Sequence, residues 1–414
     1  PDDQVGWGSY MTLREESYSN QDMLIKKIIE RIENNNPYIS DEELKIANLY
    51  KSFIDRDKVN RLGYDPILPE LKIISEISNV IDLWQYFSRS IKTGSSTPIR
   101  IFIYDDLKDP LNYTIYIDQG GLGLPDRDYY LEDNYKEIRS AYITHIENLL
   151  RLASIKNPKQ KALSAFEIEN ELAKVQLSRL EMRDPERIYN PYKKDRLYDL
   201  GGKYWNEWVE ELGLESQNKF IVESPVYITA LVNLMNEIPI DKWKDYLIVR
   251  LVKGSAGSLS DDFILESFEF SKILTGREKL PDLWKRAVGL VNGIMGDALG
   301  KIYVNEFFPP EYKDKMEILV DNLLESYRIG IQELEWMSDE TKKRALEKLS
   351  KMRVKIGYPE VWDDYEGLEI NPDDLYGNLN NSAIFGYKKA LKRLNGPVDR
   401  LSLIHISEPT RLAT

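Results

Sequence analysis

The chain has 414 residues, of which 42% are hydrophobic and 30% charged, and its formal net charge is −13. This composition allows a large buried core, and the length suggests two or more domains because single cores stop growing at about 250–300 residues. The negative charge argues against nucleic acids and anionic membranes as partners, and the absence of cysteine excludes disulfides and thiolate metal sites.

The first half of the chain predicts helices interrupted by one hairpin. Apolar residues recur on one face of a helix near the N-terminus, at Leu24, Ile25, Ile28, Ile29 and Ile32. Two runs of alternating β-branched and aromatic residues, Ile99–Tyr104 and Asn112–Asp118, flank the turn-rich DDLKDPLN. We therefore predict a mainly α fold with a small β-hairpin and no segment long and apolar enough to span a membrane.

The stretch GGLGLPDRDYYL, residues 120–131, follows the hairpin. Asp126 stands where a dinucleotide-binding loop needs its third glycine, so the stretch is not a Rossmann fingerprint. Its glycines permit backbone conformations closed to other residues, and Asp126 or Asp128 is suited to cap the next helix. We expect a structural loop that leads into a long helix beginning near Tyr129, with Arg127 free to pair with a carboxylate.

His145 is one of only two histidines in the chain. It lies near an apolar helical stripe that includes Tyr142 and Leu149, and no other metal-ligand residue accompanies it at ligand spacing. We expect a buried or half-buried histidine that is hydrogen-bonded by a neighbour.

Three glutamates in FEIENELAKVQ, Glu167, Glu169 and Glu171, raise the possibility of a carboxylate enzyme such as a helical glycosidase. Their spacing splays them around a helix, which favours a solvated charged face instead. The glycosidase stays an alternative hypothesis, and a non-catalytic peptide-binding or structural helical module is another.

The C-terminal third contains further helical signals. Gly296 and Gly300 are four apart in a helical context and would let another helix approach closely. A second core-facing stripe is predicted at Val320, Leu323, Leu324, Tyr327, Ile331 and Leu334. Ser338 is suited to cap the helix after that. A short strand is expected at Met352–Tyr358.

The stretch QGGLGLPDRDYYL and five ordered blocks around it resemble the N-terminal region of the neprilysin-like M13 zinc metallopeptidases. The five blocks are WGSYMTLREES, RLEMRDPERIYNPY, LWKRAVGLVNGIMGDALGKIYVNEFF, WMSDETKKRALEKLSKMRVKIGYPEVWDDYEGLEI and LKRLNGPVDR. The resemblance covers essentially residues 1–400. It implies the multi-helix lid lobe of a two-lobed enzyme that hydrolyses oligopeptides.

In the family, two histidines of an HExxH helix hold Zn²⁺ and the glutamate between them activates water. No HExxH occurs in this chain. We therefore expect Zn²⁺ only in the intact enzyme and none bound by these residues. We assign no catalytic, metal-binding or cofactor-binding residue here, and we expect the 414-residue chain to be inactive.

The last residues, 401–414, do not resemble the family. Leu401–Arg411 resembles the conceptual translation of a transposon end used to build DNA sequencing libraries. We therefore expect two parts, residues 1–400 as the M13 region, incomplete at its N-terminus, and residues 401–414 as a non-native tail. His405 lies in this tail and receives no function.

Alignment on WGSYMTLREE places Gly6 and Met11 where animal neprilysin has an arginine and an aspartate that handle the substrate's C-terminal end. Neither residue can take that electrostatic role, so the resemblance favours a broader endopeptidase. It also favours an extracytoplasmic location, periplasmic or membrane-anchored, over a cytoplasmic one.

Overall fold

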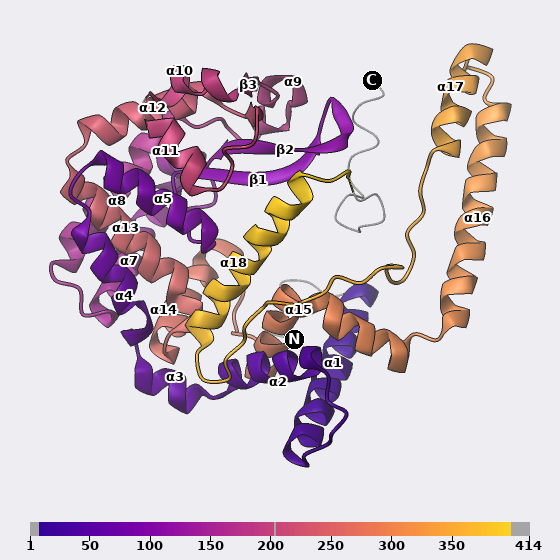
Figure 1. Cartoon of the computed structure of the whole chain (residues 1–414), viewed down its shortest axis with the longest axis horizontal. Coiled ribbons are helices and arrows are strands. Elements are labelled where there is room, and N and C mark those ends of the chain that lie inside the picture. Colours follow the sequence, from indigo (N-terminus) through magenta and orange to yellow (C-terminus); the bar gives the residue numbers. More distant parts are fainter. Residues whose placement is uncertain (1–7, 203, 399–414) are drawn as a thin grey trace. The chain divides into compact units, whose positions relative to one another are not determined.

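The computed structural model describes residues 8–202 and 204–398 (Figure 1). The chain divides into two compact units. The first holds residues 8–13, 47–287 and 367–398, and the second holds residues 14–46 and 288–366. Three of the boundaries fall within helices α1 (Ser9–Glu33), α2 (Asp41–Ile54) and α15 (Leu283–Phe307), and the fourth lies in the turn between residues 366 and 367.

The first unit is a helical body built around four helices that pack on one another, α7 (Lys136–Leu152), α8 (Pro158–Val175), α13 (Ile240–Ser255) and α14 (Asp261–Thr275). The remaining helices of this unit are α3 (Arg56–Leu62), α4 (Leu68–Glu76), α5 (Val80–Lys92), α6 (Asp128–Leu131), α9 (Pro185–Ile188), α10 (Tyr198–Gly201), α11 (Tyr204–Glu211), α12 (Pro225–Glu237) and α18 (Leu375–Leu394). Short 3₁₀ turns link several of them, at Asp65–Ile67, Asp133–Tyr135, Glu181–Arg183, Lys194–Arg196 and Ala256–Ser258.

A four-stranded sheet completes this unit, in the order β1-β2-β4-β3. Strands β1 (Ile99–Asp106) and β2 (Asp109–Gln119) form the antiparallel hairpin that the sequence predicts, so that prediction is confirmed. The short strand β4 (Lys219–Val222) pairs parallel to β2, and β3 (Pro191–Lys193) pairs antiparallel to β4. The GLGLPDR loop leaves the end of β2, as expected.

The helix after this loop starts later than predicted. Residues 128–131 form only the short α6, because Glu132 has an extended backbone with φ −92° and ψ 142°. Asp133 and Asn134, which favour turns, follow, and the long helix α7 begins at Lys136. The prediction of a helix from Tyr129 was therefore wrong by about two turns.

The second unit contains most of α1 and α15 together with α16 (Pro310–Glu333) and α17 (Asp339–Ser350). The predicted apolar face of α1 is confirmed, since Leu24, Ile25 and Ile28 are buried. The Ser338 cap is also confirmed, because its hydroxyl accepts a hydrogen bond from the Thr341 amide at 3.3 Å.

Three other predictions for the second unit were wrong. Helix α16 forms, but none of its residues is buried. Residues 352–358 form no strand, because none of the strands that the structure describes pairs with them, and the side chains of Met352 and Val354 are 56% and 42% exposed. A Cβ on Gly296 would meet nothing within 4 Å, and the neighbour of Gly300 is the ring of Trp362 rather than a helix.

The predicted tail at residues 401–414, with His405, lies outside the described residues, as does Gly6. Met11 lies in α1. Among the residues that the structure describes, no helix combines the length and the apolarity that crossing a bilayer requires.

Candidate functional site

The GLGLPDR loop is held by close packing at its glycines. Gly121 has φ +87°, and a Cβ there would lie 2.5 Å from the Tyr246 hydroxyl. A Cβ on Gly123 would lie 1.6 Å from the Tyr142 hydroxyl, which no real side chain tolerates. The Tyr246 hydroxyl donates a hydrogen bond to the Gly121 carbonyl at 2.8 Å. The glycines are therefore needed because two tyrosine side chains occupy the space beside them.

Behind the loop lies a buried polar cluster formed by Glu169, Tyr130, Tyr142 and Arg250, which we call the Glu169 network. Glu169 is fully buried. Its carboxylate accepts hydrogen bonds from the Tyr130 hydroxyl at 2.6 Å and from the Tyr142 hydroxyl at 3.0 Å. Arg250 lies 3.3 Å from the same carboxylate. Burial raises the pKa of both tyrosines well above the usual value, so they act as hydrogen-bond donors.

The network also fixes the loop backbone. The Tyr130 hydroxyl accepts hydrogen bonds from the amides of Gly123 and Leu124, both at 2.9 Å. The prediction that Glu169 lies on a solvated face was thus wrong, because its partners come from three other segments of the chain. Glu167 and Glu171 do lie at the surface, paired with Lys242 and Lys174.

The loop exit follows the sequence prediction only in part, because Arg127 stands at the N-cap position of α6 and this helix has no side-chain capping hydrogen bond. The Asp126 carboxylate accepts a hydrogen bond from the Asp128 amide at 2.9 Å, at the start of α6. Arg127 donates to the carbonyl of Gln176 and lies 4.0 Å from the Asp128 carboxylate. These contacts attach the loop to its own helix and to the end of α8.

His145 is a core residue, as predicted. Its Nδ1 lies 3.0 Å from a carboxylate oxygen of Glu266, and its ring stacks on Phe270 with the ring centroids 4.8 Å apart. Asn148 donates to the other oxygen of Glu266 at 3.2 Å. Burial lowers the pKa of His145, so the neutral ring is favoured.

A second buried carboxylate site lies where the parallel strands β2 and β4 end. Ile117 pairs with Val222, which places Asp118 and Glu223 beside each other one residue further on. Both side chains are buried, and Arg100 from β1 donates to Asp118. Burial and the nearby charge of Asp118 raise the pKa of Glu223 to about 8. Nothing in the sequence pattern singled out this pair, because β4 is only four residues long.

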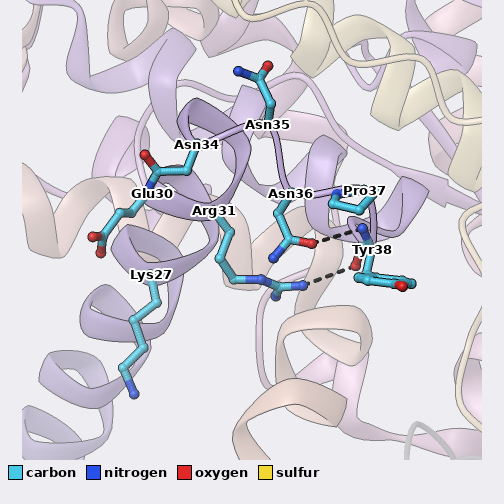
Figure 2. Close-up of a pocket in the computed structure, with 8 residues that line it drawn as sticks. All are labelled: Lys27, Glu30, Arg31, Asn34, Asn35, Asn36, Pro37 and Tyr38. Carbon is cyan, nitrogen blue, oxygen red and sulfur yellow. Dashed lines mark hydrogen bonds between the residues drawn. The ribbon is translucent and has the colours of Figure 1, made fainter.

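A surface hollow of about 560 Å³ lies at the C-terminal end of α1 (Figure 2). It is lined by Lys27, Glu30, Arg31, Asn34, Asn35, Asn36, Pro37 and Tyr38. Figure 2 shows Arg31 reaching toward Tyr38, whose carbonyl accepts a hydrogen bond from it at 3.0 Å. Arg31 is also paired with Glu43 at 2.5 Å, and Lys27 with Glu306 at 3.0 Å. These cations are already engaged, and the lining residues include no pair arranged for proton transfer.

The residues present do not fit a catalytic zinc ion. Such an ion needs three protein ligands and an open position for water. Across residues 8–202 and 204–398, no group of three or more His, Asp or Glu side chains is arranged to hold a metal. The two buried carboxylate clusters are instead neutralised by arginine, Arg250 in one and Arg100 in the other.

The sequence model of peptidase family M13 matches residues 1–359, which is most of the chain. The chain belongs to peptidase family M13. Human neprilysin is 27% identical over 398 residues, covering 86% of this chain and 53% of neprilysin. The neutral endopeptidase of Lactobacillus helveticus is 29% identical, covering 88% of this chain and 57% of that enzyme.

Solved structures of M13 relatives agree with this assignment. An inhibitor-bound zinc metalloprotease of Mycobacterium tuberculosis superposes with a TM-score of 0.90 at 32% identity. The match covers 97% of this chain and 61% of the mycobacterial one. The chain therefore has the mainly helical M13 fold that the sequence predicted, and it spans about half the length of the curated M13 relatives.

Proposed function

We propose that the intact protein is a zinc-dependent M13 endopeptidase that hydrolyses oligopeptides, and that these 414 residues carry none of its catalytic groups. The observation that carries the proposal is the family match over residues 1–359 in a chain that contains no HExxH. The zinc ligands and the catalytic glutamate would lie in polypeptide that corresponds to the unmatched part of the relatives.

Residues 1–400 would then form the lid region, and residues 401–414 a non-native tail. In such an arrangement the helical body restricts which substrates reach the metal and takes no part in bond cleavage. The Glu169 network supports this role, since its groups are buried and satisfied by one another rather than turned toward a substrate.

For specificity, we propose a broad endopeptidase rather than a dipeptide-releasing enzyme. Met11 and Gly6 replace the charged pair that handles the substrate's C-terminal carboxylate in animal neprilysin, and neither can bind a carboxylate by charge. We also propose an extracytoplasmic location, which the name of a human relative, membrane metallo-endopeptidase-like 1, supports.

The test compares two proteins. The purified 414-residue chain should retain no stoichiometric zinc after dialysis and show no chelator-sensitive cleavage of a quenched peptide. The product of the native gene, read past the codon for Arg400, should retain stoichiometric zinc and cleave the peptide in a chelator-sensitive reaction. Specific zinc in the 414-residue chain, or a native continuation without HExxH, would contradict the proposal. Tight peptide binding by the short chain without turnover would favour the alternative of a binding module.

The glycosidase alternative loses its support. It relied on Glu169 and its neighbours as candidate acid and base groups, and Glu169 is fully buried. Glu167 and Glu171 are tied to surface lysines.

A further inference from the structure

Helix α16 carries two neighbouring apolar stripes that differ in exposure. The inner stripe, Val320, Leu324 and Ile331, is half-buried. The outer stripe is exposed and follows helical spacing, with exposed fractions of 52% at Tyr312, 44% at Met316, 50% at Leu319, 51% at Leu323 and 64% at Tyr327. At 1.5 Å per residue, the outer stripe is about 22 Å long.

The inner stripe already has a partner within the second unit. Helices α16 and α17 lie side by side (Figure 1), and the apolar residues of α17, Ala345, Leu346 and Leu349, are half-buried like those of the inner stripe. Helix α17 packs against α16, and within the second unit no described element covers the outer stripe.

An uncovered stripe of this length has an energetic cost. Burying a large apolar side chain stabilises a folded protein, and each of these five side chains is only about half covered. Contiguous exposed apolar surface on a soluble protein commonly marks an interface. The i, i+4, i+7 spacing places these five side chains in one continuous row on one face of the helix. Scattered surface residues would not follow this spacing.

We propose that the outer stripe of α16 is the surface on which the remaining polypeptide of the same protein docks. The relatives identify this occupant, because the chain spans only 53% of human neprilysin and 57% of the Lactobacillus helveticus enzyme. A covalently linked segment has an effective concentration in the millimolar range, which favours it over a second copy of the chain. The inference rests on the proposed function only in requiring a longer intact protein.

Thiol labelling tests the proposal, since the 414-residue chain contains no cysteine. Leu319→Cys places a thiol on the outer stripe. Ile318→Cys is the matched control, because Ile318 lies on the opposite face of the same helix and is 61% exposed. Any cysteine in the native continuation is first replaced by serine. A maleimide reagent is then applied to both variants, in the 414-residue chain and in the intact protein.

In the 414-residue chain both thiols should react at similar rates. In the intact protein the thiol at position 319 should react at least about tenfold more slowly, with no change at position 318. Equal rates at position 319 in the two proteins would overturn the proposal. Protection in the 414-residue chain that grows with its concentration would also overturn it, in favour of a second copy. Tyr327→Cys repeats the test if Leu319→Cys fails to fold.

The labelling readout is independent of catalysis. An intact protein that protects position 319 but has no zinc-dependent activity would refute the proposed function and leave the docking surface standing. An active zinc peptidase with position 319 unprotected would support the proposed function and refute the docking surface.

Discussion

The surroundings of α8 in the first unit and of α16 in the second depart from ordinary packing in opposite ways. Around α8 a charged carboxylate is fully buried, and every partner it needs comes from the same unit. Around α16 a row of large apolar side chains is left exposed. The first unit therefore satisfies its buried carboxylate from within, whereas the second leaves large apolar side chains exposed on one helix face.

The largest expected effect comes from Glu169→Gln. Removing this charge leaves the Arg250 guanidinium buried without a counter-charge, which should lower the free energy of unfolding by about 3–5 kcal/mol. Urea denaturation followed by the fluorescence of the buried Trp205, Trp208 and Trp243 measures it. The control is Glu171→Gln, on the exposed face of the same helix, where the change should stay below about 0.5 kcal/mol. Similar values for the two variants would mean that the network does not stabilise the first unit.

Next comes the pH dependence set by Glu223. Its pKa rises from 4.5 in the unfolded chain to about 8 in the folded one. The protonated carboxyl therefore contributes its full stabilisation below pH 4.5, and this contribution is lost as the pH rises to about 8. At pH 7 the loss amounts to roughly 3 kcal/mol.

Glu223→Gln should remove this slope, so the variant should be more stable than the parent chain near pH 8 and converge with it near pH 4.5. Unfolding free energies measured in urea at several pH values test the difference. Parallel curves for parent and variant would show that the pKa of Glu223 is not raised in the folded chain.

A smaller loss is expected from Gly123→Ala. The new methyl group would collide with the Tyr142 hydroxyl and displace it from Glu169, at a cost of about 1–3 kcal/mol. Thermal unfolding checks this. Gly254→Ala in α13 serves as the control, because a Cβ there meets nothing within 4 Å.

The smallest effect is expected from Gly330→Ala in the second unit, which should raise the free energy of unfolding rather than lower it. Gly330 lies within α16, and a Cβ there meets nothing within 4 Å. Gly330→Ala should stabilise the helix by about 0.5–1 kcal/mol, because alanine loses less backbone entropy. Circular dichroism during thermal unfolding would detect it. A loss of stability would show that this part of α16 is more closely packed than its exposure indicates.

The sequence predicted those features whose interacting residues lie close together along the chain. The β1–β2 hairpin was predictable because its alternating pattern and its turn lie within one short stretch. Glu169 was not, because Tyr142, Tyr130 and Arg250 lie 27, 39 and 81 residues away from it. Spacing on α8 shows that its glutamates point in different directions, but not that one direction leads into a polar core.

The errors on the second unit have a related cause. The apolar residues of α16 correctly predicted a helix, but periodicity cannot tell whether a partner for the stripe lies within the same residues. The alternation at residues 352–358 likewise indicates a strand only where a neighbouring strand can pair with it. For the candidate site, the sequence predicted only that these residues hold no zinc ligands. This stays a prediction.

The order in which the first unit is assembled on the ribosome follows from its interrupted course along the chain. Residues 367–398 belong to this unit, and Leu394 and Val398 enter its core, yet residues 288–366 are translated before them. At about 5–20 residues per second, the apolar surface awaiting α18 stays open for several seconds after α14 has emerged. A nascent chain that pauses within this interval would expose that surface to chaperones, so codon usage between residues 288 and 366 should influence the yield of folded protein.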